Sequence, residues 1–148
     1  MIIYQEGTAK KKEITEHLNA CNQLFNPALS SYVNISQYSI RLKEFAHTFE
    51  AWDNSILIGL VGCYLNDNIN YNGHISNVSV IKEYHGKGIA KKLLATTIKK
   101  ASQLGMKSIT LEVESTNNAA IKLYKNIGFE ISGKNKNKYS MILILHSK

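Results

Sequence analysis

A strand-like run, a glycine turn and a helical run follow one another between positions 74 and 104. HISNVSVI reads as a strand, HGKG contributes two glycines, and IAKKLL opens an apolar stripe at helical spacing. A glycine turn that opens a helix can aim several backbone N–H groups at one point, where the helix dipole adds partial positive charge. The segment therefore favours an anion site, most of all one for phosphate. The competing interpretation is a tight strand-to-helix turn with solvated lysines, and this stretch alone does not separate the two.

Strand-like and helix-like segments alternate along the rest of the chain without an internal repeat. Strands are expected at 2–4, 47–51, 56–65, 74–81, 108–113, 129–132 and 139–145. Helices are expected at 9–25, 35–45, 89–104 and 118–126. With 148 residues, 44% of them hydrophobic, the chain is long enough for one good core and too short for two ordinary domains. We therefore predict a single mixed α/β domain spanning residues 1–148.

The charge balance favours anionic partners without naming one. Lys and Arg number 18 against 11 Asp and Glu, which gives a formal net charge of +7. Arg41 is the only arginine, so bidentate recognition of guanine edges has almost nothing to use. A nucleic-acid-binding module that uses the lysines of 10–12, 99–100 and 134–138 is an alternative, and its binding would weaken steeply with salt. A solvated lysine-rich surface explains the same residues more simply, and we expect no nucleic-acid partner.

Three sequence features indicate the cellular compartment of the protein. The longest apolar run, from Ile56 to Leu65, is about half of what a membrane span requires. The first residues lack the order of charge, apolar block and cleavage site of a secretory signal. Cys21 and Cys63 are far apart, which suits a reducing compartment. These features predict a cytoplasmic protein with no membrane partner, and we expect no metal site.

Two segments together carry a family resemblance. VSVIKEYHGKGIAKKLL, followed by LEVESTNNAAIKLYKNIGFE, resembles the two central motifs of the GNAT superfamily of acetyl-CoA-dependent N-acetyltransferases. The first family pattern is Arg or Gln, two residues, Gly, one residue, then Gly or Ala, and it falls on His85, Gly88 and Ala90. His85 departs from the Arg or Gln of the pattern. The resemblance implies an α/β (α+β) GNAT fold, with a mixed, mostly antiparallel sheet of about seven strands and about four helices.

The resemblance also implies a cofactor site for acetyl-CoA (coenzyme A). The backbone N–H groups of the glycine turn would hold the pyrophosphate, with lysines adding charge. The strand before the turn would lie along the pantetheine arm, and Asn117 would contact that arm or simply cap the following helix. The expected cofactor-binding residues are Val78, Ser79, Val80, His85, Gly86, Lys87, Gly88, Ile89, Ala90, Lys91, Asn117 and Tyr124.

Two residues match catalytic positions of the family. Tyr124 lies where the family has a tyrosine that can protonate the departing thiolate, although a core tyrosine beside Phe129 is the competing interpretation. Glu112 matches a glutamate that serves as base in the branch acetylating ribosomal-protein N-termini. Strand alternation places Glu112 with Thr110 and Glu114 on one face. An ordinary strand carboxylate paired with a lysine explains Glu112 equally well.

The acceptor is less constrained than the donor. The expected substrate-binding residues are aromatic, amide and imidazole side chains: Tyr38, Tyr64, Asn66, Tyr71 and His74. A polar, uncharged, stacking surface suits an amino sugar or a sugar nucleotide, so we expect a small-molecule amine acceptor. Residues 58–94 also resemble small acetyltransferases of bacterial surface-polysaccharide pathways. Two alternatives for the function stay open: acetylation of a peptide N-terminus or lysine, and binding of acetyl-CoA without catalysis. Tyr64, His74 and His85 are weaker candidates for the catalytic base. The apolar segment YSMILIL also leaves open a homodimer.

Overall fold

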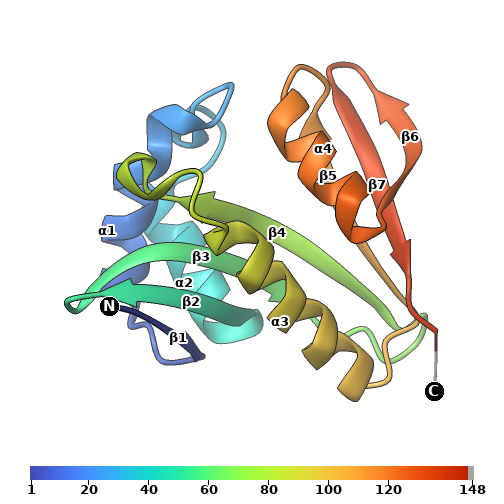
Figure 1. The fold of residues 1–148 in the computed structure, drawn as a ribbon, viewed down its shortest axis with the longest axis horizontal. Helices are drawn as coiled ribbons and strands as arrows, with labels where there is room; N and C mark the ends of the chain where they lie inside the picture. The colour runs from blue at the N-terminus through green and yellow to red at the C-terminus, as the bar shows by residue number, and fades with distance from the viewer. Residues whose placement is uncertain (147–148) are drawn as a thin grey trace. The chain divides into compact units, whose positions relative to one another are not determined.

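A computed structural model describes residues 1–146. Seven strands have the order β1-β2-β3-β4-β5-β7-β6, and four α-helices accompany them within the described residues (Figure 1). The strands are β1 (Ile2–Glu6), β2 (His47–Asp53), β3 (Ile56–Tyr64), β4 (Asn72–Val80), β5 (Ser108–Glu114), β6 (Glu130–Asn135) and β7 (Lys138–Ile144). The helices are α1 (Lys11–Cys21), α2 (Ile35–Phe45), α3 (Ile89–Gln103) and α4 (Asn118–Ile127), with short 3-10 helices η1 (Asn22–Leu24), η2 (Leu29–Ser31) and η3 (Lys82–Tyr84). The mixed, mostly antiparallel α/β fold is as predicted.

The largest difference from the predicted elements concerns α1, which is shorter at both ends than the expected helix over 9–25. Lys10 has an extended backbone, and its N–H donates to the Glu13 carboxylate at 2.9 Å, so the helix begins only at Lys11. At the other end the chain tightens into η1 after Cys21. By contrast, α2 has its predicted bounds, because the Asn34 side chain caps it by accepting the N–H of Gln37.

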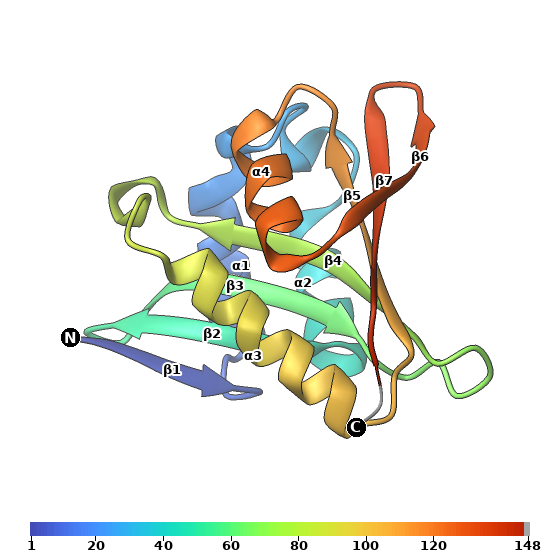
Figure 2. The same ribbon diagram turned by 45° about the vertical axis from the view of Figure 1, so that its right-hand side comes forward.

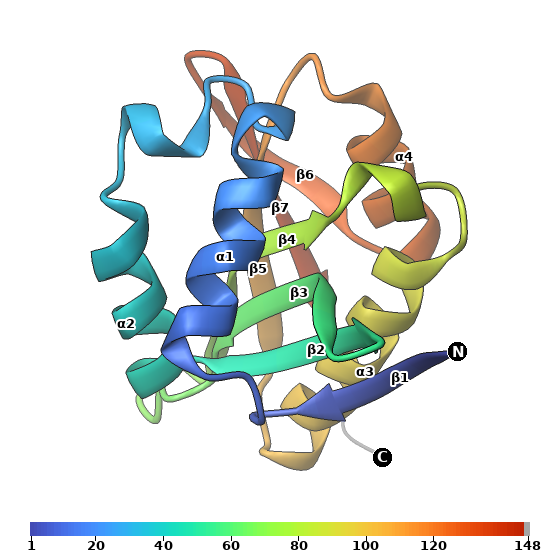
Figure 3. The ribbon, with the colours of Figure 1, turned by 90° about the vertical axis from the view of Figure 1, so that its left-hand side faces the viewer.

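The described chain divides into two compact units, and the first consists of Met1–Cys63 and Asn77–Thr97. Its strands β1, β2 and β3 form antiparallel ladders. A Cβ on Gly59 would lie 2.9 Å from Ile89 of α3, whereas one on Gly62 would lie 2.8 Å from Leu42 of α2. Since strand positions three apart point to opposite faces, α2 and α3 pack on opposite faces of β3 through these glycines. Figure 3 shows α2 beside α1, on the side away from α3.

A fully buried carboxylate fixes the link between β1 and α1 in this unit. Glu50 on β2 accepts hydrogen bonds from the backbone N–H groups of Thr8 and Ala9, both at 3.0 Å. The hydroxyl of Thr48 donates to it at 2.6 Å and the indole of Trp52 at 3.2 Å. These donors compensate the burial of the charge. Glu50 is therefore a structural residue that holds the turn into α1.

The second unit consists of Tyr64–Ser76 and the described residues from Ile98 on. In it β5 runs parallel to the start of β4 and antiparallel to β7, and β6 and β7 form the hairpin seen in Figure 2. Ile109, Leu111 and Val113 of β5 are buried. Thr110, Glu112 and Glu114 alternate with them, so the predicted division of the β5 side chains between two faces is confirmed.

Two further properties concern the described residues as a set. Within residues 1–146, none of the helices combines the length and the apolar character that a membrane span needs. The same residues contain no cluster of three or more His, Cys, Asp or Glu side chains able to hold a metal ion.

Candidate cofactor and catalytic residues

The glycine turn lies between η3 and α3 in the first unit. Gly86 and Gly88 have φ values of +79° and +76°, which side chains other than glycine rarely adopt. The N–H of Lys92 donates to the carbonyl of Gly88 at 3.1 Å, and helix geometry leaves the preceding N–H groups, those of residues 89–91, without partners inside α3. A Cβ on either glycine would meet no atom within 4 Å, so the space around the turn is open. The turn, with exposed Lys87 and Lys91, fits a phosphate.

Side-chain hydrogen bonds brace the stem of this turn. The Tyr84 hydroxyl donates to Asp53 at the end of β2 at 2.6 Å, and this bond lowers the pKa of the Asp53 carboxyl. Nε2 of His85 lies 2.7 Å from the carbonyl oxygen of Val80. Because a carbonyl only accepts, His85 donates its ring N–H and ties the turn to the end of β4. The departure from the family pattern at His85 therefore has a structural role in this chain.

The strand residues expected along the pantetheine arm have mixed exposure. Val78 and Val80 are half-buried, whereas Ser79 is buried with its hydroxyl 2.9 Å from Nε2 of His17 and 2.8 Å from the Asn77 amide oxygen. Nδ1 of His17 lies 2.8 Å from the carbonyl oxygen of Leu57 and donates to it. We name the set Leu57, His17, Ser79 and Asn77 the buried chain. It leaves only the backbone of Ser79 for a cofactor.

The buried chain holds its histidine neutral. Desolvation lowers the pKa of His17 to about 4, despite the opposing effect of the bond to Leu57. Cys21, one helical turn away, has its Sγ 3.7 Å from Nε2 of His17, and burial raises the pKa of that thiol to about 11. A protonated thiol is a weak nucleophile, so this buried environment does not activate Cys21 for covalent chemistry.

In the second unit, Tyr124 lies on α4 and is 7% exposed. Its ring packs edge-on against Phe129 with centroids 6.0 Å apart, so the core interpretation describes its packing. Burial raises the pKa of the phenol to about 12, which keeps it protonated at neutral pH. Asn117 caps α4 by accepting the N–H of Ala120 at 3.2 Å. Both residues therefore have structural roles, and their cofactor roles stay predictions.

A polar network covers one face of β4 and β5 in the second unit. Ser108 donates to the Asn72 amide oxygen at 2.8 Å, and the Asn72 NH2 group donates to Thr110 at 3.2 Å. Nδ1 of His74 lies 3.0 Å from the same Thr110 hydroxyl. We name the set Ser108, Asn72, Thr110 and His74 the open chain, because its last member is exposed. Partial burial lowers the pKa of His74, and the charge of Glu112 raises it.

The other expected acceptor residues are spread over both units. Tyr38 in the first unit is 6% exposed, with the Arg41 guanidinium 5.5 Å from its ring centroid, so an acceptor could contact only that small remaining surface. In the second unit Tyr64 is half-buried and Asn66 exposed. Tyr71 is 38% exposed, and its ring faces Lys107 at 5.4 Å. Of the predicted residues of the second unit, the structure places His74 and Glu112 on adjacent strands.

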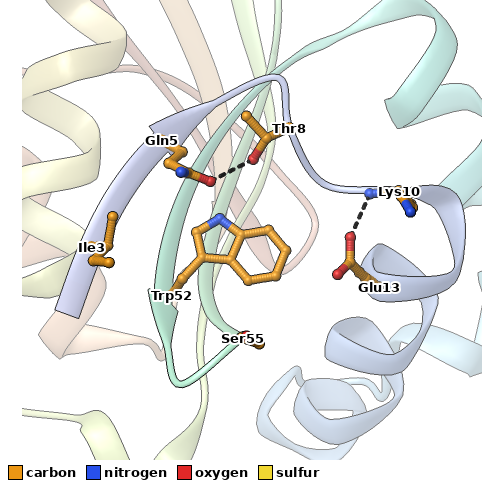
Figure 4. Close-up of a pocket in the computed structure, with 7 residues that line it drawn as sticks. All are labelled: Ile3, Gln5, Thr8, Lys10, Glu13, Trp52 and Ser55. Atoms are coloured by element: carbon orange, nitrogen blue, oxygen red, sulfur yellow. Dashed lines mark hydrogen bonds between the residues drawn. The ribbon is translucent and has the colours of Figure 1, made fainter. Parts of the chain in front are cut away.

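A hollow of about 350 Å³ lies elsewhere in the first unit, beside the indole of Trp52 (Figure 4). None of its lining residues is among the expected cofactor-binding, catalytic or acceptor residues; they are Ile3, Gln5, Thr8, Lys10, Glu13, Trp52 and Ser55. The hydrogen bonds drawn there join Thr8 to Gln5 and Lys10 to Glu13, so they stabilise the turn into α1. Sequence reasoning also missed Glu50 and His17, since nothing in the local pattern marks a strand glutamate or a helix histidine as buried.

The chain belongs to the acetyltransferase (GNAT) family, whose profile matches residues 11–129. Its fold is accordingly the GNAT fold, and acetyl-CoA is the cofactor of this family. A chain of the crystallised NatC complex bound to Gag peptide and CoA is 28% identical, with a TM-score of 0.76 over 98% of this chain and 99% of that one.

The chain is also similar in sequence to curated proteins named as N-alpha-acetyltransferases. N-alpha-acetyltransferase 30 of Saccharomyces cerevisiae is 33% identical over an alignment of 122 residues that covers 77% of this chain and 69% of that protein. N-alpha-acetyltransferase MAK3 of Arabidopsis thaliana is 35% identical over 82 residues, which are 55% of this chain and 43% of that protein. The chain spans about half the length of the first curated relatives that it matches.

Proposed function

We propose that this chain transfers the acetyl group of acetyl-CoA to the α-amino group of a peptide. The observation that carries the proposal is the match to the GNAT family over residues 11–129, together with relatives named as N-alpha-acetyltransferases. The exposed polar face of β4 and β5, with Glu112 and His74, supplies groups able to accept a proton from an ammonium.

The donor side of the proposal uses mostly backbone. The N–H groups of residues 86–91 would hold the pyrophosphate, with Lys87 and Lys91 screening its charge. The backbone of residues 78–80 would pair with the amides of the pantetheine arm, as an added strand does. Asn117 keeps its capping bond to Ala120 and would offer its amide NH2 group to the same arm. Acetyl-CoA supplies the acyl group and a thiol leaving group.

Tyr124 and Glu112 both take part in the proposed proton transfers. The Tyr124 phenol, protonated through its burial, would donate to the thiol sulfur as it leaves. The Glu112 carboxylate, exposed on β5, would assist removal of a proton from the acceptor's ammonium. Both act without a covalent intermediate on the enzyme, so orientation of amine and thioester would provide much of the rate.

The acceptor that we propose differs from the one we first expected. An amino sugar or sugar nucleotide was predicted from aromatic and amide side chains, and none of the relatives reported above has such a substrate in its name. A peptide α-amine was the alternative, and those relatives favour it. Acceptor binding by Tyr64, Asn66 and Tyr71 stays a prediction, equally compatible with a peptide backbone.

Release of thiol from acetyl-CoA tests the proposal. The purified chain is given short peptides with different first residues, the same peptides with blocked α-amines, amino sugars and polyamines, and mass spectrometry locates any acetyl group. Acetylation of free but not blocked peptides is expected. Turnover of amino sugars or polyamines with none of peptides would overturn the peptide assignment. Protection of the chain by acetyl-CoA against thermal unfolding measures cofactor binding separately.

A further inference from the structure

We infer that His74 takes the proton from the acceptor's ammonium at Nε2, with Glu112 as its counter-charge. This inference rests on the proposed acetyl transfer and assigns the base within it. His74 lies on β4 in register with Thr110 of β5, and Glu112 follows Thr110 by two residues on the same face. Both side chains are exposed, so an acceptor and water can reach them.

The open chain determines which ring nitrogen of His74 is available. Thr110 has one hydroxyl proton and three polar neighbours: the Asn72 NH2 group at 3.2 Å, Nδ1 of His74 at 3.0 Å and the carbonyl of Gly73 at 3.5 Å. Asn72 donates to Thr110, and the Gly73 carbonyl can only accept. All these contacts are satisfied together when Thr110 donates to Gly73 and accepts from His74.

In that arrangement Nδ1 carries the hydrogen, and Nε2 carries the lone pair. The Ser108 hydroxyl supports it from the far end, since its bond to the Asn72 oxygen turns the Asn72 NH2 group towards Thr110. A base whose second nitrogen is fixed by a hydrogen bond has a defined tautomer and ring orientation. Thr110 and Asn72 are therefore positioning residues for His74.

The charges around His74 suit a base. Partial burial lowers its pKa, so the ring is neutral at neutral pH and can accept a proton. The charge of Glu112 opposes that shift and stabilises the imidazolium once it forms. Glu114 lies further along the same face of β5, and its register partner on β7 is Lys138. Of these groups, Glu112 is the one whose charge acts on His74.

The proton balance closes without another reactant. The acceptor ammonium gives one proton to His74 Nε2, and the freed lone pair forms the C–N bond to the thioester carbonyl carbon. As the C–S bond breaks, the Tyr124 hydroxyl gives its proton to sulfur and regains one from the acceptor nitrogen, which has become the amide nitrogen. His74 then releases its proton to water, which its exposure allows. The products are the amide, the thiol and one solvent proton.

The test compares His74→Asn with the wild-type chain on a peptide acceptor. Asn retains an N–H donor for Thr110 and removes Nε2, so we expect kcat to fall about 10²- to 10⁴-fold with an unchanged Kd for acetyl-CoA. His146→Asn, at an exposed position outside the strands, is the matched control and should leave kcat unchanged. Thr110→Val should lower kcat because the tautomer is no longer fixed, and Thr110→Ser should restore it.

The pH profile separates His74 from Glu112 as the base. If His74 is the base, kcat/KM of the wild type rises with pH as the imidazole loses its proton, below the ordinary histidine range. Glu112→Gln removes a charge that raises the His74 pKa, so this limb should move to lower pH. If Glu112 were the base, Glu112→Gln would abolish the limb instead, and the inference would be wrong. Two peptides with different α-amine pKa values identify any contribution of the acceptor, which moves with the peptide.

The remaining outcomes are distinguishable. An active wild type whose turnover survives His74→Asn overturns the role of His74 and leaves the proposed function standing. A wild type inactive on every amine, although acetyl-CoA protects it from unfolding, overturns the proposed function together with this inference. If His74→Asn fails to fold, the Glu112→Gln profile alone decides.

Discussion

The buried chain and the open chain are built from the same kinds of side chain in opposite environments. Each contains a histidine, an asparagine of β4 and a hydroxyl within 3.0 Å of the imidazole. In the buried chain both ring nitrogens of His17 have partners and desolvation lowers its pKa to about 4. In the open chain one nitrogen of His74 is held and the ring reaches the surface. Burial, and not residue type, therefore separates the structural role of His17 from the chemical role proposed for His74.

Tyr124 is the strongest test of this contrast between buried and exposed groups, because it is buried and we nevertheless assign it a chemical role. A proton donor must carry its proton, and the raised pKa of about 12 ensures this. Tyr124→Phe should lower kcat about 10²- to 10⁴-fold while the Kd for acetyl-CoA stays unchanged. Steady-state turnover and calorimetric cofactor binding measure the two quantities. Tyr139→Phe on half-buried β7 is the control, and equal turnover of both variants would remove Tyr124 from the mechanism.

The stability of the protein in acid tests the buried histidine, because His17 resists protonation in the folded chain. Its pKa is about 4 when folded and near 6.5 when unfolded, so below pH 6.5 the unfolded state binds more protons. The free energy of unfolding should therefore fall by about 3 kcal/mol as the pH drops from 6.5 towards 4, at about 1.4 kcal/mol per pKa unit, and the effect levels off below.

Urea denaturation at a series of pH values measures this slope. His17→Asn should lose stability at pH 7, because Ser79 loses its imidazole partner, and should show a flatter dependence on acid. His146→Asn, exposed near the end of the described residues, should keep the wild-type slope. A slope that survives His17→Asn would place the acid-sensitive group elsewhere.

Local patterns could be predicted from the sequence, and long-range registers could not. The glycine turn, the bounds of α2 and the two faces of β5 follow from neighbouring residues. Contacts between His17 and Ser79 join positions 62 residues apart, and no periodicity shows which strand residue a helix histidine will meet. Tyr38 shows the limit, since it was expected to bind an acceptor, whereas the structure leaves it only 6% exposed. The role proposed for Glu112 rests on the family resemblance, and Thr110 became informative once β4 was placed beside it.

Two glycines with a similar backbone conformation, one before α3 and one after it, allow the same kind of comparison for the backbone. Gly86 has a φ of +79° and Gly105 at the end of α3 one of +81°, and a Cβ on either would meet no atom within 4 Å. Alanine at either position should cost roughly 1–2 kcal/mol of stability through the left-handed backbone alone. Gly86→Ala should also weaken acetyl-CoA binding, whereas Gly105→Ala should not. Urea denaturation and calorimetry separate the two effects, and equal affinities would argue against the turn as the phosphate site.

The smallest expected effect concerns His85, whose Nε2 donates to the carbonyl of Val80 at 2.7 Å. The family pattern has Arg or Gln at this position, and both can also donate an N–H. His85→Gln should therefore keep the turn braced and leave the Kd for acetyl-CoA within about twofold, whereas His85→Ala loses a hydrogen bond of about 0.5–1.5 kcal/mol and should raise the Kd severalfold. Calorimetric titration of the two variants measures the difference. If Gln weakens binding as much as Ala, the imidazole itself contacts the cofactor, and a side chain contributes to a site that we describe as backbone. That result would bring His85 into the same class as His74, an exposed ring with one nitrogen fixed on β4 or β5 and the other available to a ligand.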